Sequence, residues 1–137
     1  MALLDTTFLI DLMKETKSKR RGRATQKLAE LNQRGDPLRV AVFTIAELEV
    51  GVVKCSQPAR ERRAIETCME PFEVVNFSVS TARIFGSIVG RLELEGQPIS
   101  DMDGLIASVA LELGEPVVTR NPKHFDRVPG LRVETYG

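Results

Sequence analysis

Short apolar runs alternate along the chain with longer segments whose apolar residues recur every three or four positions. The short runs predict strands at 2–5, 38–43, 72–77 and 115–119, with a short edge strand at 131–135. The longer segments predict helices at 6–15, 24–35, 44–53, 58–69, 78–96 and 99–114. Strands separated by helices indicate an α/β domain with a mainly parallel sheet of four to five short strands, covered by helices on both faces.

The last of these helices carries an unusual charge pattern. An apolar stripe from Leu105 to Leu113 repeats at helical spacing and predicts a buried face. The same segment, 99–114, opens with Asp101 and Asp103 and has no cation nearby in sequence. Something elsewhere in the folded chain must therefore compensate this charge.

Three acids follow predicted strands or open predicted helices at matching points of the fold. Asp5 ends the first strand, Glu47 lies in the first helical turn after the second, and Asp103 lies in the first turn of the last helix. Ligands of open parallel sheets bind beyond the carboxyl ends of the strands, so we expect the three carboxylates to meet there. Two carboxylates about 4 Å apart repel by roughly 4 kcal/mol, which a divalent cation relieves. Oxygen ligands favour Mg²⁺ or Mn²⁺ over Zn²⁺.

Helix capping is the alternative explanation for two of these acids. The segments from Thr44 to Glu47 and from Ser100 to Asp103 both fit the Ser/Thr-x-x-acid pattern, in which the acid caps its own helix. Asp5 could likewise cap the helix that follows it. Taken singly, each acid suits either role, but three acids at matching positions favour a shared site.

Two further aspartates lie close to this set in sequence. Asp101 is two positions from Asp103, which on a helix is a different face, so we expect it to support the site rather than bind a metal directly. Asp11, on the helix after Asp5, is expected to face solvent.

Composition limits the class of protein. The 137 residues, 42% hydrophobic and 28% charged, suit one globular domain spanning 1–137. No apolar run approaches the roughly 20 residues that cross a bilayer, and no signal peptide precedes Asp5, so we expect a cytoplasmic protein that does not enter a membrane. Cys55 and Cys68 match no metal-finger spacing and are expected to be reduced thiols.

Positive charge is concentrated in one segment, although Lys plus Arg and Asp plus Glu are balanced at 19 each. Residues 14–27 hold seven Lys and Arg residues against one Glu, and Lys19, Arg20, Arg21 and Arg23 stand close together. Such a segment suits either a solvated loop leading into a helix or a patch that contacts RNA phosphates.

Other catalytic classes lack their residues. The only histidine, His124, has no nucleophile elbow beside it and is expected in a surface loop. Thr7 stands where a haloacid-type phosphatase needs its second aspartate. No glycine-rich phosphate loop occurs either.

Several ordered segments resemble the PIN-domain ribonucleases, in particular the VapC-type toxins of VapBC toxin–antitoxin systems. They are "LLDTTFLI", "FTIAELEVGV" and "ISDMDGLIASVALELGEPVVTRNPKHFDRVPGLRVE", which together cover the chain nearly end to end. The resemblance implies a three-layer α/β/α domain that hydrolyses RNA phosphodiester bonds with Mg²⁺ or Mn²⁺. It assigns metal ligation to Asp5, Glu47 and Asp103.

The resemblance extends to supporting residues and partners. The family often has a further acid after the fourth strand, where this chain offers Asn121 as a supporting polar group. From the residues themselves, Thr6 and Thr119 suit either a supporting role in the site or a backbone cap, and Arg120 suits either a contact to the RNA backbone or a surface charge. A homodimer is implied, together with a VapB-type antitoxin whose tail covers the acidic cleft. The alternative is a PIN-fold module that binds protein or RNA but has little or no catalytic activity.

Overall fold

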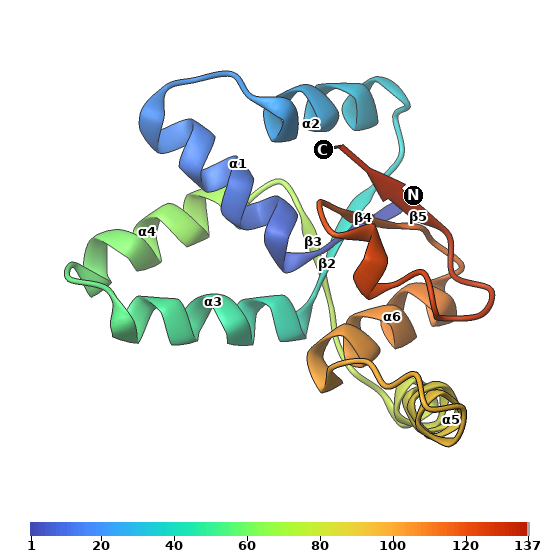
Figure 1. Ribbon diagram of the computed structural model, residues 1–137. Helices are drawn as coiled ribbons and strands as arrows, with labels where there is room; N and C mark the ends of the chain where they lie inside the picture. Colours follow the sequence, from blue (N-terminus) through green and yellow to red (C-terminus); the bar gives the residue numbers. More distant parts are fainter. Residues whose placement is uncertain (137) are drawn as a thin grey trace.

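The structure is a computed structural model that describes residues 1–136. Five parallel strands form its centre. The strands are β1 (Ala2–Leu4), β2 (Leu38–Ala41), β3 (Glu73–Val75), β4 (Val117–Thr119) and β5 (Val133–Thr135). Their order across the sheet is β3-β2-β1-β4-β5, and each neighbouring pair is parallel (Figure 1). The predicted parallel sheet is thus confirmed, with β1 at its centre.

Helices cover both faces of this sheet. The α-helices of the described residues are α1 (Thr6–Ser18), α2 (Arg23–Gln33), α3 (Val42–Lys54), α4 (Pro58–Met69), α5 (Val79–Leu94) and α6 (Asp101–Leu113), and a 3-10 helix, η1, spans Pro122–His124. Side chains of α1 to α4 belong to one hydrophobic core, and those of α5 and α6 to a second. Figure 1 shows α5 and α6 set apart from the other helices. The expected three-layer α/β/α fold is confirmed.

Alternation along the strands separates these two cores. Leu4 and Val118 point into the core beneath α1 to α4, whereas their neighbours Leu3 and Val117 point into the core beneath α5 and α6. Strands this fully covered are apolar on both faces, which is why they appear in the sequence as continuous apolar runs rather than as alternating ones. None of the helices within residues 1–136 is both long and apolar enough to cross a bilayer.

The order in which strands are added to the sheet reverses direction at β1. From β1 the chain adds β2 and β3 on one side, whereas β4 and β5 lie on the other. The crevice beside the carboxyl end of β1 is therefore the switch point at which parallel sheets bind ligands. The last turn of α6 leads into the start of β4. The first turn of α6 therefore lies at the other edge of the sheet, where the strands end.

Several element boundaries differ from the sequence prediction by two or three residues, and the start of α3 is the one that matters for the site. Helix α3 begins at Val42 rather than Thr44, and its N-cap residue, Ala41, makes no side-chain cap. The apolar run through Phe43 hid this boundary, because strand and helix core positions are both hydrophobic. As a result, Thr44 lies buried inside the helix and caps nothing.

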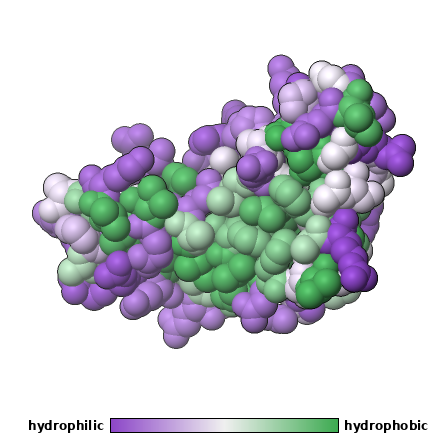
Figure 2. All heavy atoms as spheres, turned by 90° about the horizontal axis from the view of Figure 1, so that it is seen from below, coloured by the Kyte–Doolittle hydropathy of each residue, from purple (hydrophilic) through white to green (hydrophobic). Residues whose placement is uncertain are grey.

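Hydrophobic side chains also reach the surface on the side of the molecule where α3 and α5 lie (Figure 2). Val50 and Val53 on α3 are exposed, as are Phe77 and Val79 at the start of α5, with Val53 at 78% and Val79 at 71%. Phe77 packs edge-on against Phe43, with ring centroids 5.0 Å apart. Exposed apolar area, where it is contiguous, marks an interaction surface in many proteins.

The basic segment is fixed by a single acid, Glu15, near the end of α1. Its carboxylate accepts hydrogen bonds from the backbone N–H groups of Gly22, Ala24 and Thr25 at 2.9, 3.1 and 2.8 Å, and from the Thr25 hydroxyl at 2.7 Å. Glu15 thereby caps α2, whose own N-cap residue, Gly22, has no side chain to do so. A Cβ on Gly22 would lie 2.6 Å from the Glu15 carboxyl carbon, so a larger residue there would displace the Glu15 carboxylate.

Glu15→Gln is predicted to lower the free energy of unfolding at pH 7 by about 1 kcal/mol, because the amide loses the charge that complements the amino end of α2. Burial raises the pKa of Glu15, but the hydrogen bonds from Thr25, Ala24 and Gly22 outweigh it and leave the pKa below its ordinary value. The wild-type advantage is therefore fully present above the ordinary glutamate pKa and is lost as pH falls through the lowered one. Urea unfolding at pH 7 and at about pH 3 measures it.

Glu93→Gln, on the exposed surface of α5, serves as the matched control and is expected to unfold like the wild type at both pH values. A loss of stability in Glu15→Gln that is the same at both pH values would contradict the charge-based explanation.

Candidate functional site

Asp5 occupies the junction between β1 and α1 and is the N-cap residue of that helix. Its Oδ1 atom accepts hydrogen bonds from the Phe8 backbone N–H at 3.0 Å and from the Thr7 hydroxyl at 2.8 Å. The residue is only 4% exposed. Asp5 therefore does cap its helix, as one alternative expected, and it does so as a buried carboxylate.

The environment of Asp5 disfavours its charge. Burial raises the pKa of the carboxyl, hydrogen bonds from Thr119, Phe8 and Thr7 lower it, and the negative charge of Asp103 raises it again, for a pKa above the ordinary aspartate value. The groups that bond Asp5 are all neutral. An added cation at this carboxylate would relieve both the burial and the repulsion.

Asp103 reaches the same cleft from the opposite layer. Ser100 caps α6 by accepting from the Asp103 backbone N–H at 3.2 Å. The Asp103 carboxylate lies 3.3 Å from Nδ1 of His124, on η1. The charge of Asp103 raises the pKa of Asp5, so these two predicted acids lie near enough to interact at the end of the sheet. Asp101, in the same turn, is exposed, and its expected supporting role stays a prediction.

Glu47 is held at the cleft by a threonine rather than by its own helix. Its Oε1 atom accepts from the Thr6 hydroxyl at 2.6 Å, and Thr6 also lies 3.1 Å from the Thr44 hydroxyl. The capping explanation for Glu47 is therefore wrong, because α3 begins earlier and the carboxylate points toward the start of α1. Thr6 follows Asp5 directly in sequence, so its hydrogen bond holds the Glu47 carboxylate near the Asp5 end of α1.

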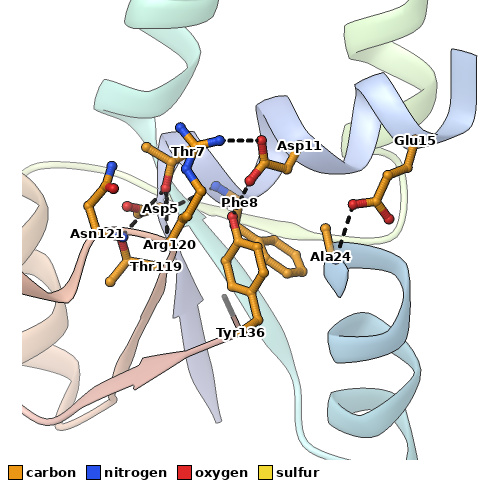
Figure 3. Close-up of polar contacts among 10 residues, drawn as sticks. All are labelled: Asp5, Thr7, Phe8, Asp11, Glu15, Ala24, Thr119, Arg120, Asn121 and Tyr136. Carbon is orange, nitrogen blue, oxygen red and sulfur yellow. Dashed lines mark hydrogen bonds and ion pairs between the residues drawn. The ribbon is translucent and has the colours of Figure 1, made fainter. Parts of the chain in front are cut away.

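Hydroxyl groups also join the ends of β1 and β4. Thr119 is fully buried, and its Oγ1 atom accepts from the Asn121 backbone N–H at 3.0 Å. The same oxygen lies 3.5 Å from the hydroxyl of Thr7. Figure 3 shows Asp5, Thr119 and Asn121 gathered at this point. Thr119 and Asn121 thus lie beside Asp5, where a supporting role requires them.

An ion pair beside this cleft was missed in the sequence. Asp11, expected to face solvent, has a side chain only 14% exposed and accepts from Nη1 of Arg120 at 2.7 Å. The Tyr136 hydroxyl donates to the other oxygen of Asp11 at 2.7 Å (Figure 3). Burial, the hydrogen bond to Asp11 and the charges of Asp11 and Asp5 raise the pKa of Tyr136 far above its ordinary value. Asp11 follows Thr7 by one helical turn, which is the only sequence signal that it faces the cleft.

The predicted RNA-contacting cations lie in two places. Arg120 stands at the rim of the cleft, 48% exposed and already paired with Asp11. Lys19, Arg20 and Arg21 are exposed at the far end of α1, whose 13 residues span about 20 Å from Asp5. Arg23 begins α2 beside them. The basic segment therefore lies far from the acids, and RNA contact at either place stays a prediction.

The donor chemistry of the cleft fits a hard divalent cation. Asp5 and Asp103 supply carboxylate oxygens, and the bonding partners of Asp5 leave its charge uncompensated. Within residues 1–136, no three His, Cys, Asp or Glu side chains stand close enough to hold a metal ion together. Mg²⁺ usually takes one or two carboxylates and completes its shell with water and substrate phosphate. The Asp5–Asp103 pair suits that mode, and ligation by Glu47 stays a prediction.

Comparison with known proteins agrees with this geometry. The PIN domain family matches residues 2–131. The chain is 31% identical over 134 residues to a tRNA(fMet)-specific endonuclease VapC of Shigella flexneri, which covers 98% of this chain and 96% of that protein. A DNA-bound VapBC structure from Salmonella typhimurium superposes with a TM-score of 0.86 at 28% identity, covering 99% of this chain and 98% of that one. VapBC-1 from nontypeable Haemophilus influenzae superposes with a TM-score of 0.85 at 29% identity, covering 98% and 97%. The chain therefore belongs to the PIN domain family, among the VapC proteins.

Proposed function

We propose that the protein is an endoribonuclease toxin that hydrolyses RNA phosphodiester bonds with Mg²⁺ or Mn²⁺. The observation that carries the proposal is the buried Asp5 carboxylate, whose pKa is raised by burial and by Asp103 at the carboxyl end of the central strand. The name of the Shigella flexneri relative, a tRNA(fMet)-specific endonuclease, supports the reaction class.

The proposed ligands of the cation are Asp5, Asp103 and Glu47. When bound, the cation supplies Lewis-acid activation of water and neutralises charge that develops on the phosphate. The protein's part is to hold the carboxylates in place: Thr7 and the Phe8 N–H orient Asp5, and Thr6 orients Glu47. Glu47 has to move to join Asp5 and Asp103 on one ion, because no three such side chains within residues 1–136 stand close enough in this structure.

A VapB-type antitoxin is the proposed partner. The Salmonella typhimurium and Haemophilus influenzae neighbours are structures of VapBC complexes. A tail of the antitoxin that covers the cleft would keep RNA away from Asp5 and Asp103 and so inhibit the enzyme. The cytoplasmic location predicted from the sequence suits an RNA substrate and stays a prediction.

Asp5→Asn and Asp103→Asn are each expected to reduce Mg²⁺-dependent RNA cleavage by about 100-fold or more, because each removes a charged ligand. Folding should survive, since asparagine caps a helix about as well as aspartate and Asp5→Asn removes a costly buried charge. The assay is cleavage of initiator tRNA and total RNA with Mg²⁺ or Mn²⁺, alongside thermal unfolding.

The control is Glu93→Gln, a carboxylate-to-amide change on exposed α5, which should cleave like the wild type. Full activity in both aspartate variants would refute the site. A wild-type protein that binds RNA but cleaves none with either cation would instead favour the module without turnover.

We also propose that a second copy of this chain covers the apolar surface formed by Val50, Val53, Phe77 and Val79. The resemblance to VapC-type toxins implies a homodimer, and this surface of α3 and α5 offers the exposed apolar area that such an interface buries.

Val53→Asp is expected to shift the protein toward monomer in sedimentation-velocity experiments at micromolar concentration. Because Val53 is 78% exposed, the new charge costs the folded monomer little. Gln26→Asp adds the same charge on exposed α2, away from α3 in Figure 1, and should leave the association unchanged. A wild-type protein that sediments as a monomer throughout would contradict the proposed dimer.

A further inference from the structure

A pocket with a volume of about 380 Å³ opens beside Asp103, between the α5–α6 connection and η1. Asp103 lies on one side of it, and Pro98 and Ile99 of the connection form part of its wall. The mechanism proposed above uses only Asp103 from this pocket. The remaining wall is formed by a different kind of residue.

Three basic side chains, Lys123, His124 and Arg127, line that wall. They come from one short segment that also contains Phe125 and Val128, which are 1% and 3% exposed and belong to the core beneath α6. The segment is thus anchored by its apolar residues, so that its basic residues are held at the surface on a fixed backbone.

Two contacts hold this basic wall in place, and one of them reaches the acidic cleft. Arg127 Nη1 donates to the backbone carbonyl of Pro98 at 2.8 Å, which ties the segment to the connection before α6. His124 Nδ1 lies 3.3 Å from the Asp103 carboxylate. The basic pocket and the proposed metal site therefore share Asp103 as a common wall.

The charge of the pocket selects its ligand. Lys123 and Arg127 are permanently positive at neutral pH, so the pocket favours an anion over a second cation. RNA carries a phosphate at every nucleotide, and a strand with one phosphate at Asp5 and Asp103 must continue past the neighbouring walls. We infer that Lys123, His124 and Arg127 form a subsite for the RNA phosphate that flanks the scissile one.

This inference rests on the proposed function, because it takes the scissile phosphate to lie at Asp5 and Asp103. The apolar wall of Pro98 and Ile99 suits the sugar or base of the same nucleotide, as stacking surfaces do in other single-strand binders. The subsite adds affinity for longer RNA and does not touch the bond that breaks.

Lys123→Ala is the main test, because Lys123 is exposed and its truncation leaves the buried anchor intact. Its affinity for a fluorescent single-stranded RNA is expected to fall roughly threefold to tenfold in the cleavage-deficient Asp5→Asn background, and the slope of log K against log salt to fall by about 0.7. Lys123→Arg keeps the positive charge and should leave both the RNA affinity and the salt slope as in the Asp5→Asn background. Arg63→Ala, an exposed cation on α4 across the sheet, is the control and should change neither.

Substrate length supplies the second measurement. In the active protein, Lys123→Ala should raise KM for RNA of several nucleotides with little change in kcat, and should leave cleavage of a dinucleotide with one phosphodiester unchanged. A dinucleotide has no flanking phosphate for the subsite to bind.

An equal effect of Lys123→Ala on dinucleotide and longer RNA, or an unchanged salt slope, would overturn the subsite. The binding measurement is independent of turnover, so an inactive wild type would defeat the proposed function while the binding data still decide the subsite.

Discussion

A carboxylate buried at the end of a central strand is unfavourable unless a positive charge compensates it, and Asp5 occupies that position. Its bonding partners are neutral, and the nearest charge that acts on it, Asp103, is of the same sign. A protein that keeps two acids in this arrangement stores electrostatic repulsion that only a cation or a proton relieves. The hydroxyl groups of Thr7 and Thr119 keep the Asp5 carboxylate in place, and the Asp103 carboxylate lies 3.3 Å from Nδ1 of His124. Their geometry therefore favours divalent-cation binding over helix capping alone.

The rest of the fold explains why these acids meet. Parallel strands deliver Asp5 and Thr119 to the same edge, and α6 leads back to β4 so that its first turn, with Asp103, lies at that edge too. Acidic and basic groups then divide the cleft: Arg120 stands at one rim with Asp11, and the wall with Lys123 lies beyond Asp103. Under the proposed function, these rims attract RNA, a polyanion, and a bound divalent cation neutralises the centre.

Local patterns in the sequence predicted the elements and the carboxyl edge of the sheet at which Asp5 lies, because hydrophobic period and strand topology determine both. They did not predict contacts between residues far apart in sequence, such as Asp11 with Arg120 and Tyr136, since nothing local to Asp11 reveals a distant partner. The cap that Glu15 provides for α2 was missed for the same reason, as was the contact of His124 with Asp103. The start of α3 was misplaced because an apolar strand runs directly into an apolar helix without a capping residue.

The central claim is that Asp5 and Asp103 share a divalent cation, and an NMR titration of the Asp5 side-chain carboxyl carbon tests it most directly. The account predicts a pKa above the ordinary aspartate value without divalent cations, which falls when Mg²⁺ is added and also falls, without Mg²⁺, in Asp103→Asn. An Asp5 pKa that neither Mg²⁺ nor the Asp103 substitution changes would contradict the claim.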